Sequence, residues 1–225
     1  MHEDKTWQPV WEELFAGQEW GKYPPEHVIR FVARRWHRLP QRGAVRILDL
    51  GCGPGACTWF MAREGYSVSG IDGSKSAIEI TRRRLTQDGL DADLHGGDYS
   101  VLPWPDNTFD GVIDNATLCC NPFKAVLKVR DEVLRVLKPG GHFQSANFTD
   151  RSWGFGLGRI ITENEYDDIP EGPHLNRGYT LFMSRKQVDE FLAPFTDRHV
   201  ELLSYTCEEM TELVELWLME ARKPE

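Results

Sequence analysis

The chain has 225 residues, of which 40% are hydrophobic and 27% are charged, as is typical of one globular domain with a single core. The formal net charge of −9 repels phosphate backbones, so nucleic acid is a disfavoured partner. No apolar run approaches the roughly 20 residues that a membrane span requires, and the polar N-terminus shows no signal peptide. We therefore expect a cytoplasmic protein without membrane association.

The five cysteines are an odd set with no CxxC or Cys/His ligand spacing. This pattern argues against a disulfide scaffold and against a zinc site. The sequence also has no run of carboxylates typical of a catalytic metal. We expect reduced thiols and no bound metal.

Residues 1–40 predict a helical cap over the open end of a sheet, because aromatic side chains are unusually frequent before the first strand. Two prolines stiffen the turn after Tyr23, which would present Trp20 and Tyr23 to a site at the sheet edge. Packing of these rings within the cap is the alternative. The aromatic residues in question are Trp7, Trp11, Phe15, Trp20 and Tyr23.

Residues 45–147 predict a parallel sheet wrapped by helices, because short runs rich in β-branched residues alternate with helical patterns. Ser74 is the expected N-cap of the second of these helices. The turn at 138–141 is expected to end the last of them. Strands are predicted at 45–49, 66–72, 92–95, 109–114 and 142–147.

The remainder of the chain divides in two. Residues 148–178 are rich in glycine and proline and predict a structureless insertion, typical of a lid or a binding loop. In 179–225, Ser184 and Gln187 fit a capping box that opens a helix ending at Phe195. Two closing strands at 199–205 and 213–221 follow, although the second segment fits a helix equally well. No second domain is indicated, so 1–225 is expected to form a single domain.

The most informative segment is the glycine loop after the first strand, which is followed at once by a helix. Asp49 ends the strand, and Gly51, Gly53 and Gly55 follow. This arrangement places backbone N–H groups and the positive end of a helix dipole at the carboxyl edge of the sheet. Gly51 permits the turn, Gly53 permits close approach of a ligand, and Gly55 lets the helix pack against the strand. The G-x-G-x-G spacing differs from the G-x-G-x-x-G of dinucleotide folds and favours a ligand without pyrophosphate.

Asp72 ends the second predicted strand about twenty residues after the loop, where a carboxylate can accept both hydroxyls of a ribose. The same position suits NAD. The alternative is a cap of the next helix, in which Asp72 faces Ser74 and the amides beyond it.

Five segments, in order and at comparable spacing, resemble the successive motifs of class I S-adenosylmethionine (SAM)-dependent methyltransferases. The resemblance covers roughly residues 45–147. It implies an α/β fold with a doubly wound, mostly parallel seven-stranded sheet and an antiparallel last strand. It also implies SAM as cofactor and S-adenosylhomocysteine (SAH) as product. The segments are 48-LDLGCGPG-55, 70-GIDGS-74, 97-GD-98, 109-FDGVI-113 and 137-LKPGG-141.

The resemblance also implies roles for individual residues. Asp49 and the glycines of the loop would surround the methionyl part of SAM, and Asp72 would hold the ribose. Asp98 would accept from the adenine amino group, unless it is a plain turn residue, and Tyr99 would flank the ring. Asn115 and Ala116 would lie near the transferable methyl. The full set of expected cofactor-binding residues is Trp20, Tyr23, Asp49, Gly51, Cys52, Gly53, Gly55, Asp72, Gly73, Ser74, Gly97, Asp98, Tyr99, Asn115 and Ala116.

Candidates for catalytic chemistry are few. His174 is our candidate general base, because histidine titrates near neutral pH and lies here in a glycine-flanked loop. An exposed loop histidine without a role is the alternative. Cys119 and Cys120 are a less favoured nucleophile pair, because methyl transfer is an in-line displacement that needs orientation and at most one base. Buried apolar cysteines are the simpler interpretation.

The predicted function is methylation of an oxygen or nitrogen of a small organic metabolite. Acidic charge and the lack of a separate target-recognition domain favour a small acceptor, and aromatic residues of the cap suit an apolar pocket. Two alternatives stay open: a methyltransferase acting on a protein or tRNA, and a SAM-binding protein without transferase activity. A nicotinamide-dependent oxidoreductase would share Asp72 but requires the G-x-G-x-x-G spacing.

Overall fold

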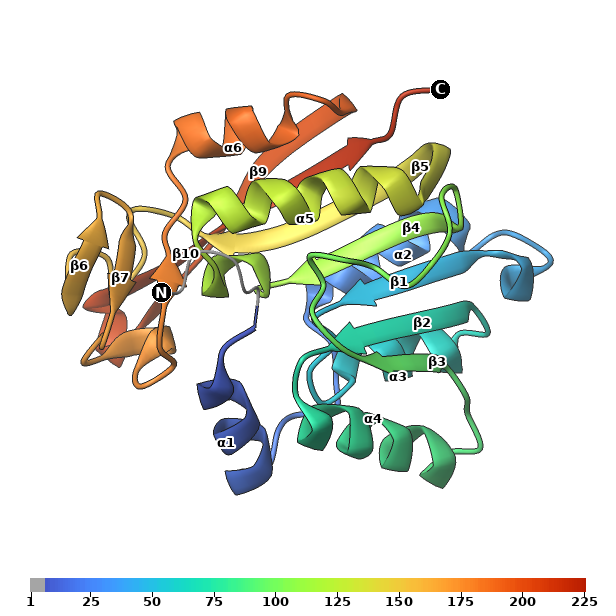
Figure 1. Cartoon of the computed structure of the whole chain (residues 1–225), viewed down its shortest axis with the longest axis horizontal. Helices are drawn as coiled ribbons and strands as arrows, with labels where there is room; N and C mark the ends of the chain where they lie inside the picture. Colours follow the sequence, from blue (N-terminus) through green and yellow to red (C-terminus); the bar gives the residue numbers. More distant parts are fainter. Residues whose placement is uncertain (1–6) are drawn as a thin grey trace.

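A seven-stranded sheet with helices on both faces forms the centre of the computed structural model, which describes residues 7–225 (Figure 1). Strand order is β3-β2-β1-β4-β5-β10-β9, and only β10, the last strand of the chain, runs antiparallel to its neighbours. The predicted fold class is therefore confirmed. The elements of the sheet layers are β1 (Arg46–Leu50), α3 (Ala56–Arg63), β2 (Ser67–Asp72), α4 (Lys75–Gln87), β3 (Asp93–Gly96), β4 (Phe109–Asn115), α5 (Phe123–Val136), β5 (Leu137–Phe148), α6 (Arg185–Leu192), β9 (Thr196–Cys207) and β10 (Glu212–Arg222).

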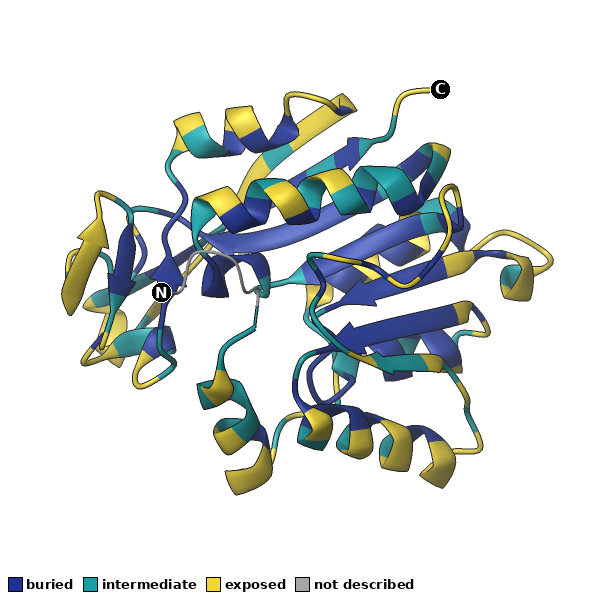
Figure 2. Cartoon of the chain, viewed as in Figure 1, coloured by how far each residue is buried: buried dark blue, intermediate teal, exposed yellow. Residues whose placement is uncertain are grey.

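The two sheet faces bury different side chains of the same strand, because successive residues point to opposite faces. Ile47 packs with residues of α3 and of the helix α2 (Glu26–Trp36). Leu48 and Leu50 pack on the other side with residues of α5 and α6. Figure 2 shows the result: the central strands are buried, and the helices expose only their outer faces.

Register brings three strand ends to one edge of the sheet. Asp49 pairs with Gly70 of β2 and with Ile113 of β4. The order of strands reverses between β1 and β4, and ligands of open α/β sheets bind in the crevice at such a switch point. The topology thus predicts a site at the carboxyl ends of β1, β2 and β4.

Residues 7–40 contain two α-helices with different roles. Helix α2 buries Val28, Phe31 and Val32 against the sheet and so belongs to the core. The short helix α1 (Pro9–Gly17) lies apart from the sheet and contacts α4 (Figure 1). Only α1 and the turn after it form a cap, so the predicted cap is shorter than residues 1–40.

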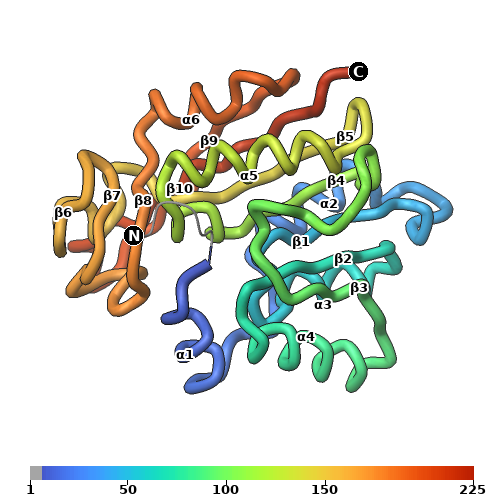
Figure 3. Tube along the Cα trace, viewed as in Figure 1, coloured from blue at the N-terminus to red at the C-terminus, as the bar shows by residue number. Residues whose placement is uncertain are grey.

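The prediction of a structureless insertion at 148–178 is wrong. The segment contains β6 (Arg159–Thr162) and β7 (Glu165–Asp167), which pair with β8 (Thr180–Leu181) in a small antiparallel sheet. Its apolar side chains, including Tyr166 and Ile169, form a separate core cluster with Phe182. The tube in Figure 3 follows this small sheet beside the end of the long β10 strand.

In the C-terminal part, residues 213–221 form a strand and not a helix. β9 and β10 form a long hairpin joined at the short helix η4 (Glu208–Met210), and β10 pairs with β5. The capping box of Ser184 and Gln187 is present, although α6 ends at Leu192 and not at Phe195. Helix α5 ends at Val136, just before the expected stop at 138–141, but β5 begins at once at Leu137 and not at 142 as predicted. The remaining short helices are η1 (Arg42–Ala44), η2 (Leu118–Cys120) and η3 (Gly172–His174).

Candidate cofactor site

A cavity of about 310 Å³ lies at the carboxyl ends of β1, β2 and β4. The glycine loop and the strand ends line one side, and the cap lines the other. The strand side comprises Asp49, Gly51, Cys52, Gly53, Pro54, Ala56, Cys57, Asp72, Tyr99, Asn115, Ala116, Thr117 and Cys120; the other side comprises Trp7, Gln8, Trp11, Phe15, Trp20, Gly21 and Arg177.

Asp72 is one of two buried carboxylates that line the cavity. Its Oδ2 accepts from the Gly53 N–H at 2.8 Å, and its Oδ1 accepts from the Ser74 N–H at 2.8 Å. Burial raises the pKa of Asp72 to about 6, against the lowering effect of the two backbone N–H groups. Each oxygen accepts one backbone bond and keeps a further lone pair, so Asp72 can cap α4 and still accept ligand hydroxyls.

The glycine loop turns through left-handed backbone and leaves no room for side chains at two positions. Gly51 has φ 64°, and a Cβ there would lie 2.1 Å from Cγ2 of Thr117. Gly55 has φ 82°, and a Cβ would lie 2.5 Å from Cγ2 of Thr81 on α4. The expected packing of Gly55 against the strand is therefore corrected to packing against α4. The Thr81 hydroxyl also donates to the Gly53 carbonyl at 2.9 Å, which holds the loop in place.

Asp49 is buried behind the loop, where its Oδ2 accepts from the Thr58 hydroxyl at 2.6 Å. Burial raises its pKa to about 7. Cys52 and Cys57 flank it along the cavity, and burial raises the pKa of both thiols. These thiols stay protonated at neutral pH and behave as small apolar groups.

The cap brings an aromatic cluster over the loop. The ring of Phe15 lies 5.5 Å from that of Trp11 and 5.1 Å from that of Trp20, measured between centroids. Phe15 also approaches Gly53, since a Cβ there would lie 3.6 Å from its Cζ. At Gly73 a Cβ would lie 1.8 Å from Cδ1 of Trp7, so glycine is required where this indole packs. Trp20 lines the cavity, and its contact with a cofactor stays a prediction.

The prediction for Tyr23 is wrong. Its side chain is 76% exposed and does not line the cavity. Its ring packs edge-on against Trp59 on α3, with centroids 5.6 Å apart. The stiff turn thus directs Trp20 inward and Tyr23 outward.

Two polar anchors fix the cap. Glu12 on α1 accepts from the hydroxyls of Ser74 at 2.5 Å and Ser76 at 2.6 Å, and these bonds lower its pKa. Ser74 is also the N-cap of α4, as predicted, and does not itself line the cavity. The second anchor is Arg84, which donates to the carbonyls of Trp20, Gly21 and Pro54.

The segment after β3 contributes Tyr99 to the cavity wall. The Gly97 N–H donates to the Asp72 carbonyl at 2.9 Å, which brings this segment beside β2. Tyr99 is buried, and its hydroxyl accepts from Asn121 at 2.8 Å. Asp98 accepts from the Ser100 N–H at 2.8 Å, as a turn residue does, and neither it nor Gly97 lines the cavity.

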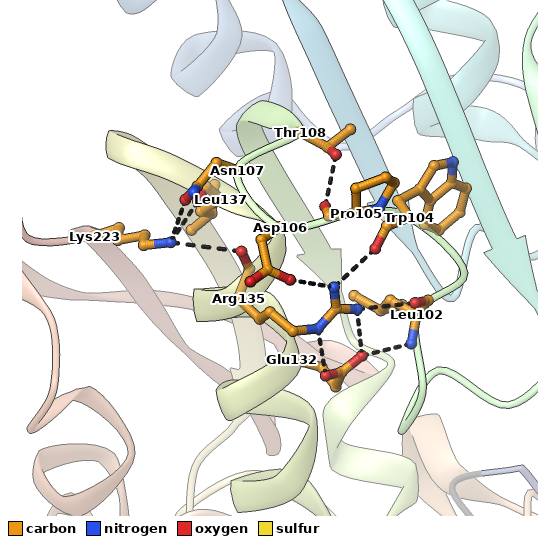
Figure 4. A network of polar contacts seen from close by, with 10 residues as sticks. All are labelled: Leu102, Trp104, Pro105, Asp106, Asn107, Thr108, Glu132, Arg135, Leu137 and Lys223. Carbon is orange, nitrogen blue, oxygen red and sulfur yellow. Dashed lines mark hydrogen bonds and ion pairs between the residues drawn. The ribbon is translucent and has the colours of Figure 1, made fainter.

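A polar network holds the segment between Tyr99 and β4 (Figure 4). Arg135 of α5 donates to the carbonyls of Leu102 at 2.9 Å and Trp104 at 2.8 Å. It also donates to the carboxylates of Glu132 at 2.7 Å and Asp106 at 2.9 Å. This network fixes the loop that carries Tyr99 to the rigid helix.

Asn115 and Ala116 line the cavity at the end of β4, as predicted. Ala116 has φ 59°, a left-handed conformation that is rare for alanine. The Asn115 Oδ1 lies 3.1 Å from Nε2 of His27, a buried residue of α2. Burial lowers the pKa of His27, so the ring is neutral and donates through Nε2. His27 therefore orients the Asn115 amide. It was not predicted, because nothing in the sequence connects α2 to the end of β4.

Cys119 and Cys120 lie in η2 as buried residues, and their Sγ atoms are 4.0 Å apart. The hydrogen bond with Cys120 and burial raise the pKa of Cys119. Cys119 also donates to the Ala116 carbonyl at 3.2 Å. These contacts support the interpretation of buried apolar cysteines over a nucleophile.

The structure contradicts the assignment of His174 as general base. The residue is 3% exposed and does not line the cavity. Its ring packs against Phe148 and Phe182, with centroids 4.4 and 5.9 Å away, and neither ring nitrogen has a hydrogen-bond partner among residues 7–225. Burial lowers its pKa to about 3, so the ring stays neutral. The apolar contacts of the ordered insertion explain the error, since they were not visible in its glycine-rich sequence.

Several cavity residues were not among the predicted site residues, among them Gln8, Cys57, Thr117 and Arg177. Thr117 follows the end of β4 and was one residue beyond the predicted pair. Gln8 and Arg177 reach the cavity only through contacts between segments far apart in the chain.

Within residues 7–225, none of the helices has the length and apolarity to cross a membrane. The same part of the chain brings no three metal-binding side chains into one group.

The sheet is Rossmann-like, with a glycine-rich turn after β1 and a buried aspartate, Asp72, at the end of β2. This arrangement is typical of α/β domains that bind nucleosides. A family model described as a methyltransferase domain matches residues 47–141. Residues 47–141 thus resemble a methyltransferase domain, and the fold around them is that of class I SAM-dependent methyltransferases, as the sequence motifs predicted.

Curated relatives and a solved structure agree with this assignment. A demethylmenaquinone methyltransferase of Clavibacter sepedonicus is 30% identical over 76% of this chain and 59% of its own length. A ubiquinone biosynthesis O-methyltransferase of Erwinia tasmaniensis is 28% identical over 86% of this chain and 81% of its own. A SAM-dependent methyltransferase structure from Methanosarcina mazei shares the fold, with a TM-score of 0.68 and 24% identity over 80% of this chain and 92% of that one. The chain spans between 44% and 59% of the length of the first four curated relatives that it matches.

Proposed function

We propose that this protein binds SAM in the cavity and transfers its methyl group to an oxygen or nitrogen of a small organic acceptor. The observation that carries the proposal is the buried Asp72 carboxylate beside the glycine loop. It offers free lone pairs to two ribose hydroxyls, and the G-x-G-x-G turn is not the dinucleotide form.

The residues around Asp72 suit the other parts of SAM. Gly53 has no side chain, so its own backbone is accessible from the cavity, and Asp49 lies behind the glycine loop. Both would face the methionyl part of SAM. Tyr99 offers a buried ring beside β2, where adenine would stack. Asn115 and Ala116 would lie near the methyl, because β4 ends on the opposite side of β1 from Asp72.

When bound, SAM supplies an electrophilic methyl on a sulfonium, and the protein's task is to align an acceptor for in-line attack. His27 and Asn115 together present a fixed amide at the end of β4. Trp11, Phe15 and Trp20 exclude water from the cavity and provide an apolar surface for an acceptor.

The names of the relatives support a small-molecule acceptor, since two of them refer to quinone biosynthesis and a third to a sterol. The third is a C-methyltransferase by name, so relatives differ in the atom that they methylate. Fold alone does not decide this, because one fold carries many reactions.

A metabolite screen tests the proposal. The protein is incubated with SAM and a library of small hydroxy and amino compounds, and SAH formation is measured for each. We expect SAH formation well above the rate without acceptor for a restricted chemical class. SAM binding without transfer to any small molecule, together with methylation of a protein or tRNA, would contradict it.

A further inference from the structure

Arg177 lies at the rim of the cavity, between η3 and β8, and is its only basic lining residue in the described part of the chain. Its guanidinium makes no hydrogen bond or ion pair with residues 7–225, unlike Arg151, which pairs with Glu215 at 2.7 Å. Its recorded contact is with the ring of Trp20, whose centroid lies 5.3 Å away. A half-buried guanidinium that lies on an aromatic wall and pairs with no carboxylate of residues 7–225 can bind an anionic ligand.

The backbone around Arg177 is fixed, so the position of its side chain is determined by the fold. The Arg177 N–H donates to the His174 carbonyl at 3.1 Å. Two residues on, the Tyr179 N–H donates to Oε1 of Gln8 at 3.0 Å, and Nε2 of Gln8 donates to the Cys120 carbonyl at 2.5 Å.

These bonds also place Arg177 on a particular side of the cavity. Gln8 ties the segment 177–179 to η2, which follows β4. Asp72 ends β2, on the far side of β1. The backbone of Arg177 therefore enters the cavity from the side of Cys120 and β4, where the acceptor would enter, and its guanidinium lies against Trp20 of the cap.

We infer that Arg177 binds a carboxylate of the methyl acceptor, so that the acceptor is an aromatic acid. The inference rests on the proposed function of the cavity. Arginine matches a carboxylate with two parallel N–H donors, and Trp20 and Trp11 provide the apolar surface for the rest of such a molecule. Among residues 7–225, Arg177 is the one basic side chain that lines the cavity, so a preference for acids would depend on it.

The test compares acids with their esters. Hydroxybenzoic, hydroxycinnamic and indole carboxylic acids, each paired with its methyl ester, are titrated calorimetrically into the SAH-saturated protein. We expect at least one acid to bind about 10- to 100-fold more tightly than its ester. Arg177→Met keeps the apolar contact with Trp20 and should abolish this preference, while Arg177→Lys should retain part of it. Arg159→Met is the matched control, because Arg159 lies in the same insertion but outside the cavity and pairs with Asp167.

Three results would overturn the inference: equal binding of acids and esters, binding of no acid at all, or an unchanged acid preference in Arg177→Met. A loss of SAH affinity in Arg177→Met would also overturn it, because the guanidinium would then serve the cofactor's carboxylate. Failure of the wild-type protein to bind SAH contradicts the proposed function instead. The acid preference of the unliganded protein then decides whether Arg177 binds acids.

Discussion

The cavity contains two buried carboxyl groups whose charges are costly to the folded protein. Burial raises the pKa of Asp49 to about 7 and that of Asp72 to about 6, well above the values near 4 of the unfolded chain. The folded state therefore binds these protons more tightly than the unfolded state. The free energy of unfolding falls as pH rises from about 4 through these raised pKa values, and the cost is complete above pH 7.

Replacing Asp49 by Asn should stabilise the protein at pH 8, because it removes this cost while the amide oxygen still accepts from Thr58. We expect a gain of about 1 to 3 kcal/mol, seen as a rise of several degrees in Tm, and little change at pH 4. Thermal unfolding at both pH values measures it. The control Asp91→Asn changes an exposed carboxylate and should alter neither Tm. An equal gain at both pH values, or none, would contradict the pKa shift.

For individual residues, the sequence predicts those whose position follows from their place on a strand or in the turn after it. Asp49, Gly51, Gly53 and Asp72 line the cavity as expected because each belongs to a local strand-and-turn motif. The sequence does not predict partners far apart in the chain. His174 lies on Phe148 and Phe182, and no local pattern reports such contacts.

Among the elements, α5 positions the loop that carries Tyr99. Arg135 forms hydrogen bonds with two loop carbonyls, and the Leu102 N–H donates to Glu132 on the same helix at 2.7 Å. Removing the guanidinium leaves these acceptors without their donor and leaves Glu132 without its ion pair.

Arg135→Met should therefore lower the free energy of unfolding by about 1 to 3 kcal/mol, as measured by urea denaturation. Arg185→Met removes an exposed i,i+4 pair with Asp189 on α6 and should change it by about 0.5 kcal/mol or less. Equal effects of the two substitutions would show that the loop network adds no stability.

The small sheet of the insertion shows why some elements escape sequence analysis. β6, β7 and β8 have four, three and two residues, which is too short for an alternating pattern to be distinguished. The glycines of the segment lie before β6, at 154, 156 and 158, and between β7 and β8, at 172 and 178. The sequence therefore shows the irregular parts more clearly than the strands. Longer elements such as β4 and α5 were predicted to within a few residues.

For the whole molecule, the seven-stranded sheet with its antiparallel last strand was predicted only through the family resemblance, because hydrophobic patterns do not determine which strands are neighbours. The order in the structure creates the switch point between β1 and β4 and so brings Asp72, Asn115 and the glycine loop to one cavity. The cap then closes this cavity through Glu12, Arg84 and Gln8, none of which the motifs include. The cofactor side of the site thus follows from the sequence, whereas the acceptor side requires the fold.

Calorimetric titration of the wild-type protein and of Asp72→Ala with SAH tests the central claim most directly. We predict one site of micromolar affinity in the wild type and binding weaker by about tenfold or more in Asp72→Ala, because charge-assisted bonds to both ribose hydroxyls are lost. NAD should give no binding heat. No binding of SAH to the wild-type protein, or the same affinity in both proteins, would contradict the account.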